Sequence, residues 1–344
     1  MSSSPKRIAT LLATVLLVLA CDARAADFAV LQKFSVAGGG GWDYLTIDAT
    51  SNRLFISRGD RVQVVDVGDG SLKGEIAGTP GVHGIALAGD LGKGYTSNGR
   101  DHSISVFDLA SLKPLTRIDT PAGDNPDAIV YDEASHRVVA FNGRSGNASI
   151  VDATRDVLVA TVALPGKPES AAVDGRGQVY VAIEDRNELA VLDLRTATMV
   201  AHWPLTGCDE PAAVAIDASA RRLFVGCHNA TMLVVDATDG RIVTKLPIGQ
   251  GVDAATFDPA TKLAFSSQSD GTMTIVREDT PESFAVLQTV ATQRGARTMA
   301  LNTTTHRACV VTAEFDEAPA VDGQRPRRTM RPGTFTLLVV GTRP

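Results

Sequence analysis

Short apolar runs, rich in Val, Ile, Leu and Phe, alternate with turn residues along the chain from about position 26 onward. Gly, Asp, Asn and Pro separate the runs, and no stretch is long and periodic enough to indicate a helix. The pattern therefore predicts an all-β fold, built from short strands that are joined by tight turns.

The strand pattern also repeats. An apolar run that ends in Asp returns at intervals of 42, 44, 41 and 43 residues, at Asp66, Asp108, Asp152, Asp193 and Asp236. A second series, out of phase with the first, opens turns such as DATSN and DPATK, at Asp48, Asp132, Asp174, Asp217, Asp258 and Asn302. The short Asp and Asn side chains suit these turns because they accept backbone hydrogen bonds from two residues further on. Four strands in each unit of about 42 residues predict the blades of a β-propeller, and the chain length predicts seven.

The segment Asn-Gly-Arg occurs twice, at 98–100 and 142–144, between the second and third strands of consecutive units. We interpret it as a tight turn of the scaffold in which Asn and Gly adopt positive φ. The Arg that follows is then a solvent-facing addition to the turn.

The duplicated segment FAVLQ, at 28–32 and 284–288, predicts how the ring closes. The second copy has the place of an outermost strand, and so does the first, whose three partner strands lie at the C-terminus. We therefore expect the N-terminal strand to complete the last blade, which leaves no open sheet edge.

The unit length, strand endings such as Tyr95-Thr96-Ser97-Asn98, and the N-terminal apolar segment resemble the YVTN repeats of YncE-like periplasmic seven-bladed β-propellers. The resemblance covers essentially the whole chain after residue 25. It implies the fold and the compartment, and it implies no particular reaction.

The first 25 residues are typical of a secretory signal peptide, since Lys6 and Arg7 precede an apolar run and Ala23-Arg24-Ala25 offers a cleavage site. Residues 26–344 then form a single β-propeller domain that is periplasmic or secreted. The alternative is a lipid anchor on Cys21, which ends the segment Val-Leu-Ala-Cys. No other run is long enough to cross a membrane.

Charge narrows the possible partners. After removal of residues 1–25 the chain has 30 basic and 38 acidic residues, a net charge of −8. A sequence-independent nucleic-acid binder needs an excess of cations, so no nucleic-acid partner is expected. We expect a monomer that binds a polar small molecule or an extracytoplasmic protein.

The loops of each unit divide between two faces. The Asp turns share one face and are repetitive, whereas the other face carries the lead-in loops, which precede each innermost strand, and the hairpin loops, which join the second strand to the third. These loops are varied and charged, the first lead-in loop ends at Asp43, and binding residues tend to lie on such loops. The candidate ligand-binding residues on this face are His83, Asn98, Arg100, Asp101, Asp127, Asn142, Arg144, Glu169, Glu184, Asp185, Glu210, His228, Asp253, Arg297 and Glu314. An internal salt-bridge network is the alternative interpretation.

Motifs for catalysis are missing from the sequence, which has no Gly-x-Ser-x-Gly, no P-loop and no dinucleotide fingerprint. No metal-binding spacing is present either, so neither a metal nor a cofactor is predicted. We therefore favour a binding or scaffold role. The alternative is a lactonase-like hydrolase, in which Glu169, Asp185 or Glu210 would act as general base or hold a metal.

Cys208 and Cys227 lie in the two loops of one unit, which predicts a disulfide in an oxidising compartment. Cys309 lies in an apolar run and is expected to be a buried free thiol. The segment 316–335 is rich in Arg and Pro and is predicted to be a loop insertion in the last blade, either a solvated loop or a basic lid.

Overall fold

The computed structural model describes residues 27–317 and 328–343. The predicted signal peptide, Cys21 and the centre of the predicted insertion lie outside the described residues. Within them, the only helical segments are two short 3-10 turns, η1 (Gly89–Leu91) and η2 (Glu184–Arg186). No helix in these ranges has the length and apolarity that a membrane crossing requires.

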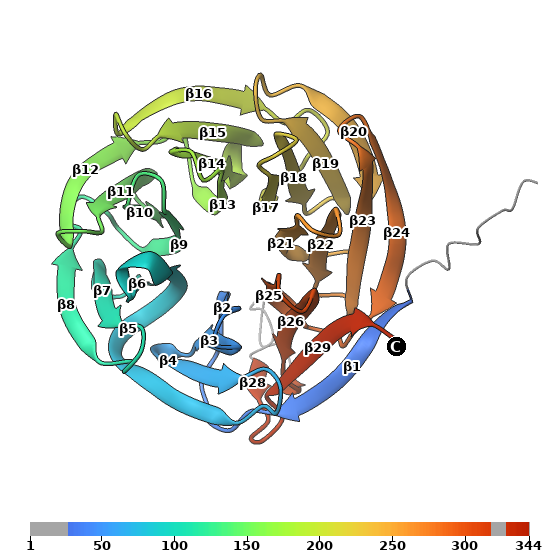
Figure 1. Cartoon of the computed structure of the whole chain (residues 1–344), viewed down its shortest axis with the longest axis horizontal. Helices are drawn as coiled ribbons and strands as arrows, with labels where there is room; N and C mark the ends of the chain where they lie inside the picture. Colours follow the sequence, from blue (N-terminus) through green and yellow to red (C-terminus); the bar gives the residue numbers. More distant parts are fainter. Residues whose placement is uncertain (1–26, 318–327, 344) are drawn as a thin grey trace, which may run out of the picture.

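The four-stranded sheets are antiparallel and stand radially around a centre (Figure 1). Where the four strands follow the order of the chain, the first is innermost and the fourth outermost. Three consecutive four-stranded sheets follow the order of the chain. They comprise β9 (Pro126–Asp132), β10 (Arg137–Asn142), β11 (Asn147–Asp152) and β12 (Val157–Ala163); β13 (Pro168–Val173), β14 (Gln178–Ile183), β15 (Glu188–Asp193) and β16 (Thr198–Pro204); and β17 (Pro211–Asp217), β18 (Arg222–Cys227), β19 (Thr231–Asp236) and β20 (Ile242–Pro247). The fold is therefore a β-propeller.

The remaining strands form a further four-stranded sheet, the closing sheet, a two-stranded hairpin and one seven-stranded sheet. The four-stranded sheet contains β21 (Val252–Asp258), β22 (Leu263–Gln268), β23 (Thr272–Thr280) and β24 (Ser283–Ala291). The closing sheet contains β25 (Arg297–Asn302), β26 (Arg307–Thr312), β29 (Thr336–Thr342) and β1 (Phe28–Ser35), and the hairpin pairs β27 (Phe315–Glu317) with β28 (Arg328–Met330). The seven-stranded sheet runs through β2 (Leu45–Asp48), β3 (Arg53–Ser57), β4 (Gly59–Asp66), β5 (Leu72–Ala88), β6 (Lys93–Asn98), β7 (Ser103–Asp108) and β8 (Pro114–Asp119).

The seven-stranded sheet arises because β5 is long enough to pair with β4 through one part and with β6 through the other. Its first part pairs with β4, from Leu72 to Ala77, and its second part pairs with β6, from Val82 to Ala88. The bend between the two parts has Gly81 at a φ of 68°, and a Cβ there would lie 2.8 Å from the backbone nitrogen of Arg100. Glycine is required at this position both for its conformation and for the close approach.

The ring is closed by the pairing of the chain ends, as the duplicated FAVLQ segment predicted. β1 pairs with β29 from Phe28–Thr342 to Ser35–Thr336, and Phe28 packs edge-on against Phe265 at 5.8 Å between ring centroids. Gln288, in the second FAVLQ copy, accepts a hydrogen bond from the Phe28 backbone N–H (2.9 Å) and donates one to the Phe28 carbonyl (2.8 Å). The two copies therefore lie side by side in adjacent sheets.

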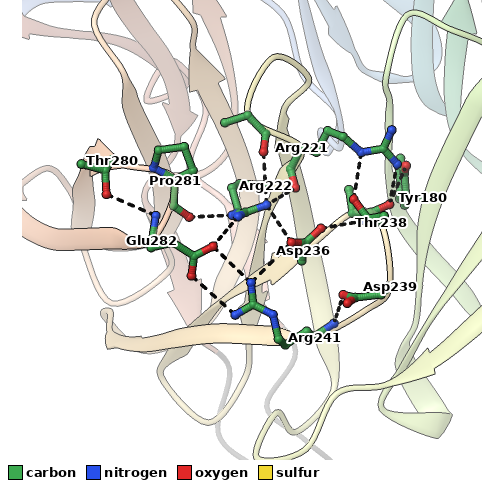
Figure 2. A network of polar contacts seen from close by, with 12 residues as sticks. Tyr180, Arg221, Arg222, Asp236, Thr238, Asp239, Arg241, Thr280, Pro281 and Glu282 are labelled. Atoms are coloured by element: carbon green, nitrogen blue, oxygen red, sulfur yellow. Dashed lines mark hydrogen bonds and ion pairs between the residues drawn. The ribbon is translucent and has the colours of Figure 1, made fainter.

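Neighbouring sheets pack face to face through apolar clusters, and polar side chains add contacts at the periphery. Figure 2 shows such a network, in which Arg222 of β18 reaches the turn between β23 and β24. Arg222 is 7% exposed, pairs with Asp236 (3.0 Å) and Glu282 (2.7 Å), and donates to the Pro281 carbonyl (2.6 Å). The network joins two sheets that are adjacent in the ring.

The repeated Asp residues stabilise the turns as expected. The Asp66 carboxylate accepts the Gly68 N–H at 2.8 Å, Asp108 accepts that of Ser111 at 2.7 Å, and Asp193 accepts that of Arg195 at 2.8 Å. Asp152 and Asp236 make the equivalent bonds to Thr154 and Thr238.

The expectation for Asn-Gly-Arg was wrong in its backbone geometry. Positive φ falls at the end of each turn, at His102 (54°) and Gly146 (59°). Asn98 instead ends β6 with its side chain fully buried, and it donates hydrogen bonds to Ser103 (3.1 Å) and Ser105 (2.9 Å) on the partner strand. The Asn side chain therefore bonds the two strands of the hairpin from inside, and the left-handed residue lies at the other end of the turn.

Candidate functional site

On the face opposite the Asp turns, five lead-in loops among the described residues are bonded through the backbone to the hairpin loop of their own unit. The same backbone bond recurs: Gly99 N–H donates to the Gly81 carbonyl (2.9 Å), Gly143 to Asn125 (3.0 Å) and Ser269 to Gly251 (2.8 Å). The last residues of the lead-in loops are thereby held at the start of the innermost strands, around the channel. We call Asp43, His83, Asp127, Glu169 and Asp253 the channel mouth.

Three residues of the channel mouth lie close together. His83 Nδ1 lies 2.7 Å from Asp43 Oδ2 and 3.7 Å from Asp127 Oδ1. All three side chains are partly buried, with exposed fractions of 30%, 32% and 18%. The Asp127 carboxylate makes no hydrogen bond to another described residue, so His83 is its nearest ionic partner there.

Glu169 has a cation beside it. Lys167, in the same lead-in loop, contacts Glu169 Oε2 at 3.2 Å and forms a closer ion pair with Glu184 of the hairpin loop. The Asp185 carboxylate accepts the Lys167 backbone N–H at 2.7 Å. Three of the predicted acids therefore meet around one lysine.

Asp253 is paired on one oxygen only. Arg297 contacts its Oδ1 at 3.1 Å, whereas its Oδ2 is buried and has no hydrogen-bond partner among the described residues. In the unit before it, Glu210 pairs with His228 Nδ1 at 2.9 Å. The structure thus brings together most of the predicted lead-in residues.

The carboxyl groups at the channel mouth have raised pKa values. Burial, with repulsion from neighbouring acids, raises the pKa of Asp127 to about 6 and that of Glu169 to about 7, and burial also raises the pKa of Asp253. The pKa of His83 is raised as well, chiefly by its hydrogen bond to Asp43. Burial is the main cause of the shift in the three acids, and the neighbouring carboxylates add to it.

Tyr44 lies beneath this charge. Its ring packs against the apolar cluster shared by the β9–β12 and β13–β16 sheets, and it lines a channel cavity of about 160 Å³. Burial and the carboxylates of Asp127, Glu169, Asp43 and Asp253 raise its pKa, so it stays a neutral phenol. The channel below the mouth is lined by innermost-strand residues that are mostly apolar, such as Ile85, Ile129 and Met299.

Other predicted site residues lie away from the mouth. Asn98 and Asn142 are buried in their hairpins, Asn142 donating to Asn147 (2.7 Å) and Ser149 (2.9 Å). The charged residues of the outer rim pair locally instead, or line shallow surface. These are Asp101 with Arg117 (2.6 Å), Arg144 with Asp124 (3.8 Å), Glu314 with Arg331 (3.0 Å), and Arg100 beside Arg58 and Arg61.

Asp43, Tyr44 and Lys167 are absent from the candidates that sequence reasoning selected. A signal for Asp43 was present, because it ends its lead-in loop as His83 and Asp127 end theirs. Nothing in the sequence distinguishes Tyr44 from a core aromatic residue or Lys167 from a solvated one.

Cysteine pairing follows the expectation. Cys208 and Cys227 form a disulfide across a separation of 19 residues, and Cys309 is a buried free thiol. Burial raises the pKa of the Cys309 thiol to about 12. The disulfide joins a lead-in loop to the end of β18 on the charged face.

Near the closing sheet, the same face has a cavity of about 880 Å³ beside the β27–β28 hairpin. Its lining combines Trp42 and Phe315 with Arg294, Arg297 and Arg331. Arg297 is shared with the channel mouth, where it pairs with Asp253.

The fold and this face define a β-propeller whose channel opens through a ring of ionisable side chains. No protein-family model matches the chain. It is similar to the uncharacterized protein YncE of Salmonella typhi and of Salmonella typhimurium, each 24% identical over 211 residues. That match covers 59% of this chain and 59% of the relative, less than the whole-chain resemblance expected from the repeats.

Solved structures show the fold more completely. The RRP9 WD40 repeats match with a TM-score of 0.73 and 9% identity, over 92% of this chain and 98% of that one. Kuenenia stuttgartiensis hydrazine synthase matches with a TM-score of 0.68 and 16% identity, over 80% of this chain and 94% of that one. At these identities the likeness concerns the propeller fold alone.

Proposed function

We propose that this chain is an extracytoplasmic, seven-bladed β-propeller that binds a polar, positively charged ligand at the channel mouth. The blade count follows if β5 is divided between its two partners, so that the seven-stranded sheet supplies two blades. The Cys208–Cys227 disulfide, the distant similarity to YncE and the signal-like residues 1–25 support export.

One observation carries the ligand class. Four carboxylates and one imidazole, each from a different lead-in loop, converge at the channel mouth, and burial raises the pKa values of Asp127, Glu169 and Asp253. Carboxylates that are held together and partly desolvated are destabilised by mutual repulsion. A bound cation relieves that repulsion, and the rigid blades hold the groups in place without the ligand.

The test is ligand-dependent thermal stability at low and high salt. Spermidine and choline should raise the melting temperature of the wild-type protein, less so at high salt because exposed electrostatic attraction is screened. The double variant Asp127→Asn/Glu169→Gln should lose the effect, and the rim variant Asp101→Asn should keep it. Stabilisation by citrate in place of the cations, or by spermidine in the double variant as well, would contradict the proposal.

Hydrolysis is a second candidate function, supported by the pKa values of about 6 for Asp127 and about 7 for Glu169. A carboxylate with a pKa near the working pH is suited to act as a general base. Turnover of a panel of lactones by the wild-type protein, lost in Glu169→Gln, would support the hydrolase; no turnover of any lactone leaves the binding function alone.

A further inference from the structure

We propose that Asp43, His83 and Asp127 bind one divalent first-row transition-metal ion at the channel mouth. The inference rests on the proposed function, because the metal would be the cation that the mouth receives. One donor atom from each residue lies within 4.8 Å of those of the other two, and His83 Nδ1 is 2.7 Å from Asp43 Oδ2 and 3.7 Å from Asp127 Oδ1. Donors bound to one ion at about 2.0–2.2 Å lie roughly 3–4 Å apart, so a small side-chain adjustment is enough.

The charge of this trio is not neutralised by the protein. Among the described residues no Lys or Arg forms an ion pair with Asp43 or Asp127, since Lys167 pairs with Glu169 and Glu184. A metal ion that binds His83 displaces any proton on its Nδ1, and the two carboxylates with the neutral imidazole then carry a charge of about −2, which one divalent ion balances.

A separate observation at the same mouth also points to a ligand. Asp253 Oδ2 is buried without a hydrogen-bond partner among the described residues, and Asp253 interacts electrostatically with Asp43 and Asp127. A buried carboxylate oxygen is costly unless it is hydrogen-bonded or close to a cation. A cation held by the trio would lower this cost through its charge, because Asp253 is coupled electrostatically to both Asp43 and Asp127.

The donor set indicates the class of metal. Oxygen ligands alone suit Ca²⁺ and Mg²⁺, whereas an imidazole nitrogen together with carboxylates suits Mn²⁺, Co²⁺ or Zn²⁺. His83 supplies that nitrogen through Nδ1, the atom that faces both carboxylates.

A second group on the same face provides a control within the molecule. Donor atoms of Glu184, Glu210 and His228 also lie within 4.8 Å of one another. The Lys167 ammonium already forms an ion pair with Glu184, so part of the charge in this group is balanced by the protein.

The experiment is isothermal titration of the chelator-treated, full-length mature protein with Zn²⁺, Mn²⁺ and Co²⁺, beside Ca²⁺ and Mg²⁺. We expect one strong site for a transition metal. His83→Ala and Asp127→Asn should each weaken the affinity at least about tenfold, the lower end of losses caused by changes next to metal ligands. The controls His228→Ala and Asp101→Asn should bind as the wild-type protein does.

The melting temperature of each metal-free variant shows whether it is folded, and Asp43→Asn replaces any variant that is not. The metal site is overturned if the wild-type protein binds no metal. It is also overturned if His83→Ala and Asp127→Asn bind the metal as tightly as the wild-type protein does. If spermidine still stabilises the protein at the mouth in that case, the proposed function stands without the metal. If spermidine also fails, both proposals are wrong.

Discussion

At the scale of single residues, Glu278 shows how a buried acid makes stability depend on pH. It is 7% exposed, beside the Asp217 carboxylate, and one of its oxygens is buried without a hydrogen-bond partner in the described ranges. Burial and the charge of Asp217 raise its pKa from 4.5 to about 7. In the folded protein the ionised form is therefore disfavoured relative to the unfolded chain.

We predict that Glu278→Gln stabilises the protein at pH 8 and has little effect at pH 4. A raised acid pKa costs no stability below the unfolded value, and the cost grows as the pH rises from the unfolded value to the folded value, above which it is complete. The rise of the pKa from 4.5 to about 7 corresponds to a gain of up to about 3 kcal/mol at pH 8, measured by denaturant unfolding at both pH values. An equal effect at pH 4 and pH 8 would show that packing, and not ionisation, is responsible.

Gly99 and Gly143 occupy the same place in consecutive units but have different surroundings. A Cβ at Gly99 would lie 2.7 Å from His83 Nε2, whereas the nearest atom to a Cβ at Gly143 is Asn125 Nδ2 at 3.7 Å. The glycine of the first Asn-Gly-Arg therefore leaves room for the His83 ring.

We predict that Gly99→Ala displaces His83 and weakens ligand or Zn²⁺ affinity about tenfold, whereas Gly143→Ala leaves it unchanged. Neither residue has a positive φ, so the comparison isolates the steric effect. Titration of both variants with Zn²⁺ and with spermidine is the measurement. Similar affinities in the two variants would mean that the His83 ring does not contribute to binding.

At the scale of elements, β1 is the strand that joins the ends of the chain. We predict that deleting Phe28–Ser35 leaves β29 as an exposed edge and causes aggregation or a large loss of stability. A chain that starts at Asp27 is the control. Size-exclusion chromatography and thermal unfolding of both chains check the prediction, and a monomeric deletion variant with an unchanged melting temperature would contradict it.

Contacts between sheets depend on burial more than on the number of ion pairs. Arg222 and Arg241 both pair with Glu282, but their side chains are 8% and 50% exposed (Figure 2). Removing a buried ionic partner leaves an uncompensated charge, whereas an exposed pair contributes little.

We therefore predict that Arg222→Met destabilises the protein by about 2–3 kcal/mol and that Arg241→Met costs less than about 1 kcal/mol. Urea unfolding of the two variants is the comparison. Equal losses would indicate that Arg222 contributes through its ion pair with Glu282 alone.

At the scale of the whole molecule, the two faces of the ring separate stability from binding. We predict that Asp193→Ala, in a turn, costs about 1 kcal/mol of stability without changing ligand affinity, because it removes local backbone hydrogen bonds. Glu169→Ala, at the mouth, should weaken affinity without destabilising the protein, because it removes a carboxylate whose ionised form is disfavoured by burial. The melting temperature and the ligand affinity are measured for both variants. If Glu169→Ala is as destabilising as Asp193→Ala and its affinity is intact, the mouth is an internal salt-bridge network and not a binding site.

Much of the architecture could be predicted from the sequence because its causes are local. Strand alternation, Asp side chains that accept the N–H two or three residues on, and a duplicated outer-strand segment each depend on neighbours within a few residues or on an exact repeat. Asp66 and Asp193 in the turns, and Phe28 at the closure, are examples. The pairing of Cys208 with Cys227 also followed, because both belong to one unit.

The composition of the site was decided by the tertiary structure. Asp43, His83 and Asp127 follow one another at intervals of 40 and 44 residues in the sequence, and only the curvature of the closed ring brings their side chains together. The pairing of β6 with β7 buries Asn98, whereas Arg144 stays exposed in its hairpin loop, although sequence reasoning ranked them alike as site residues. Strand and turn patterns are set by backbone hydrogen bonds between near neighbours, so the sequence alone determined the scaffold. Convergence at a channel depends on the position of every blade, so only the folded ring determined which charges meet.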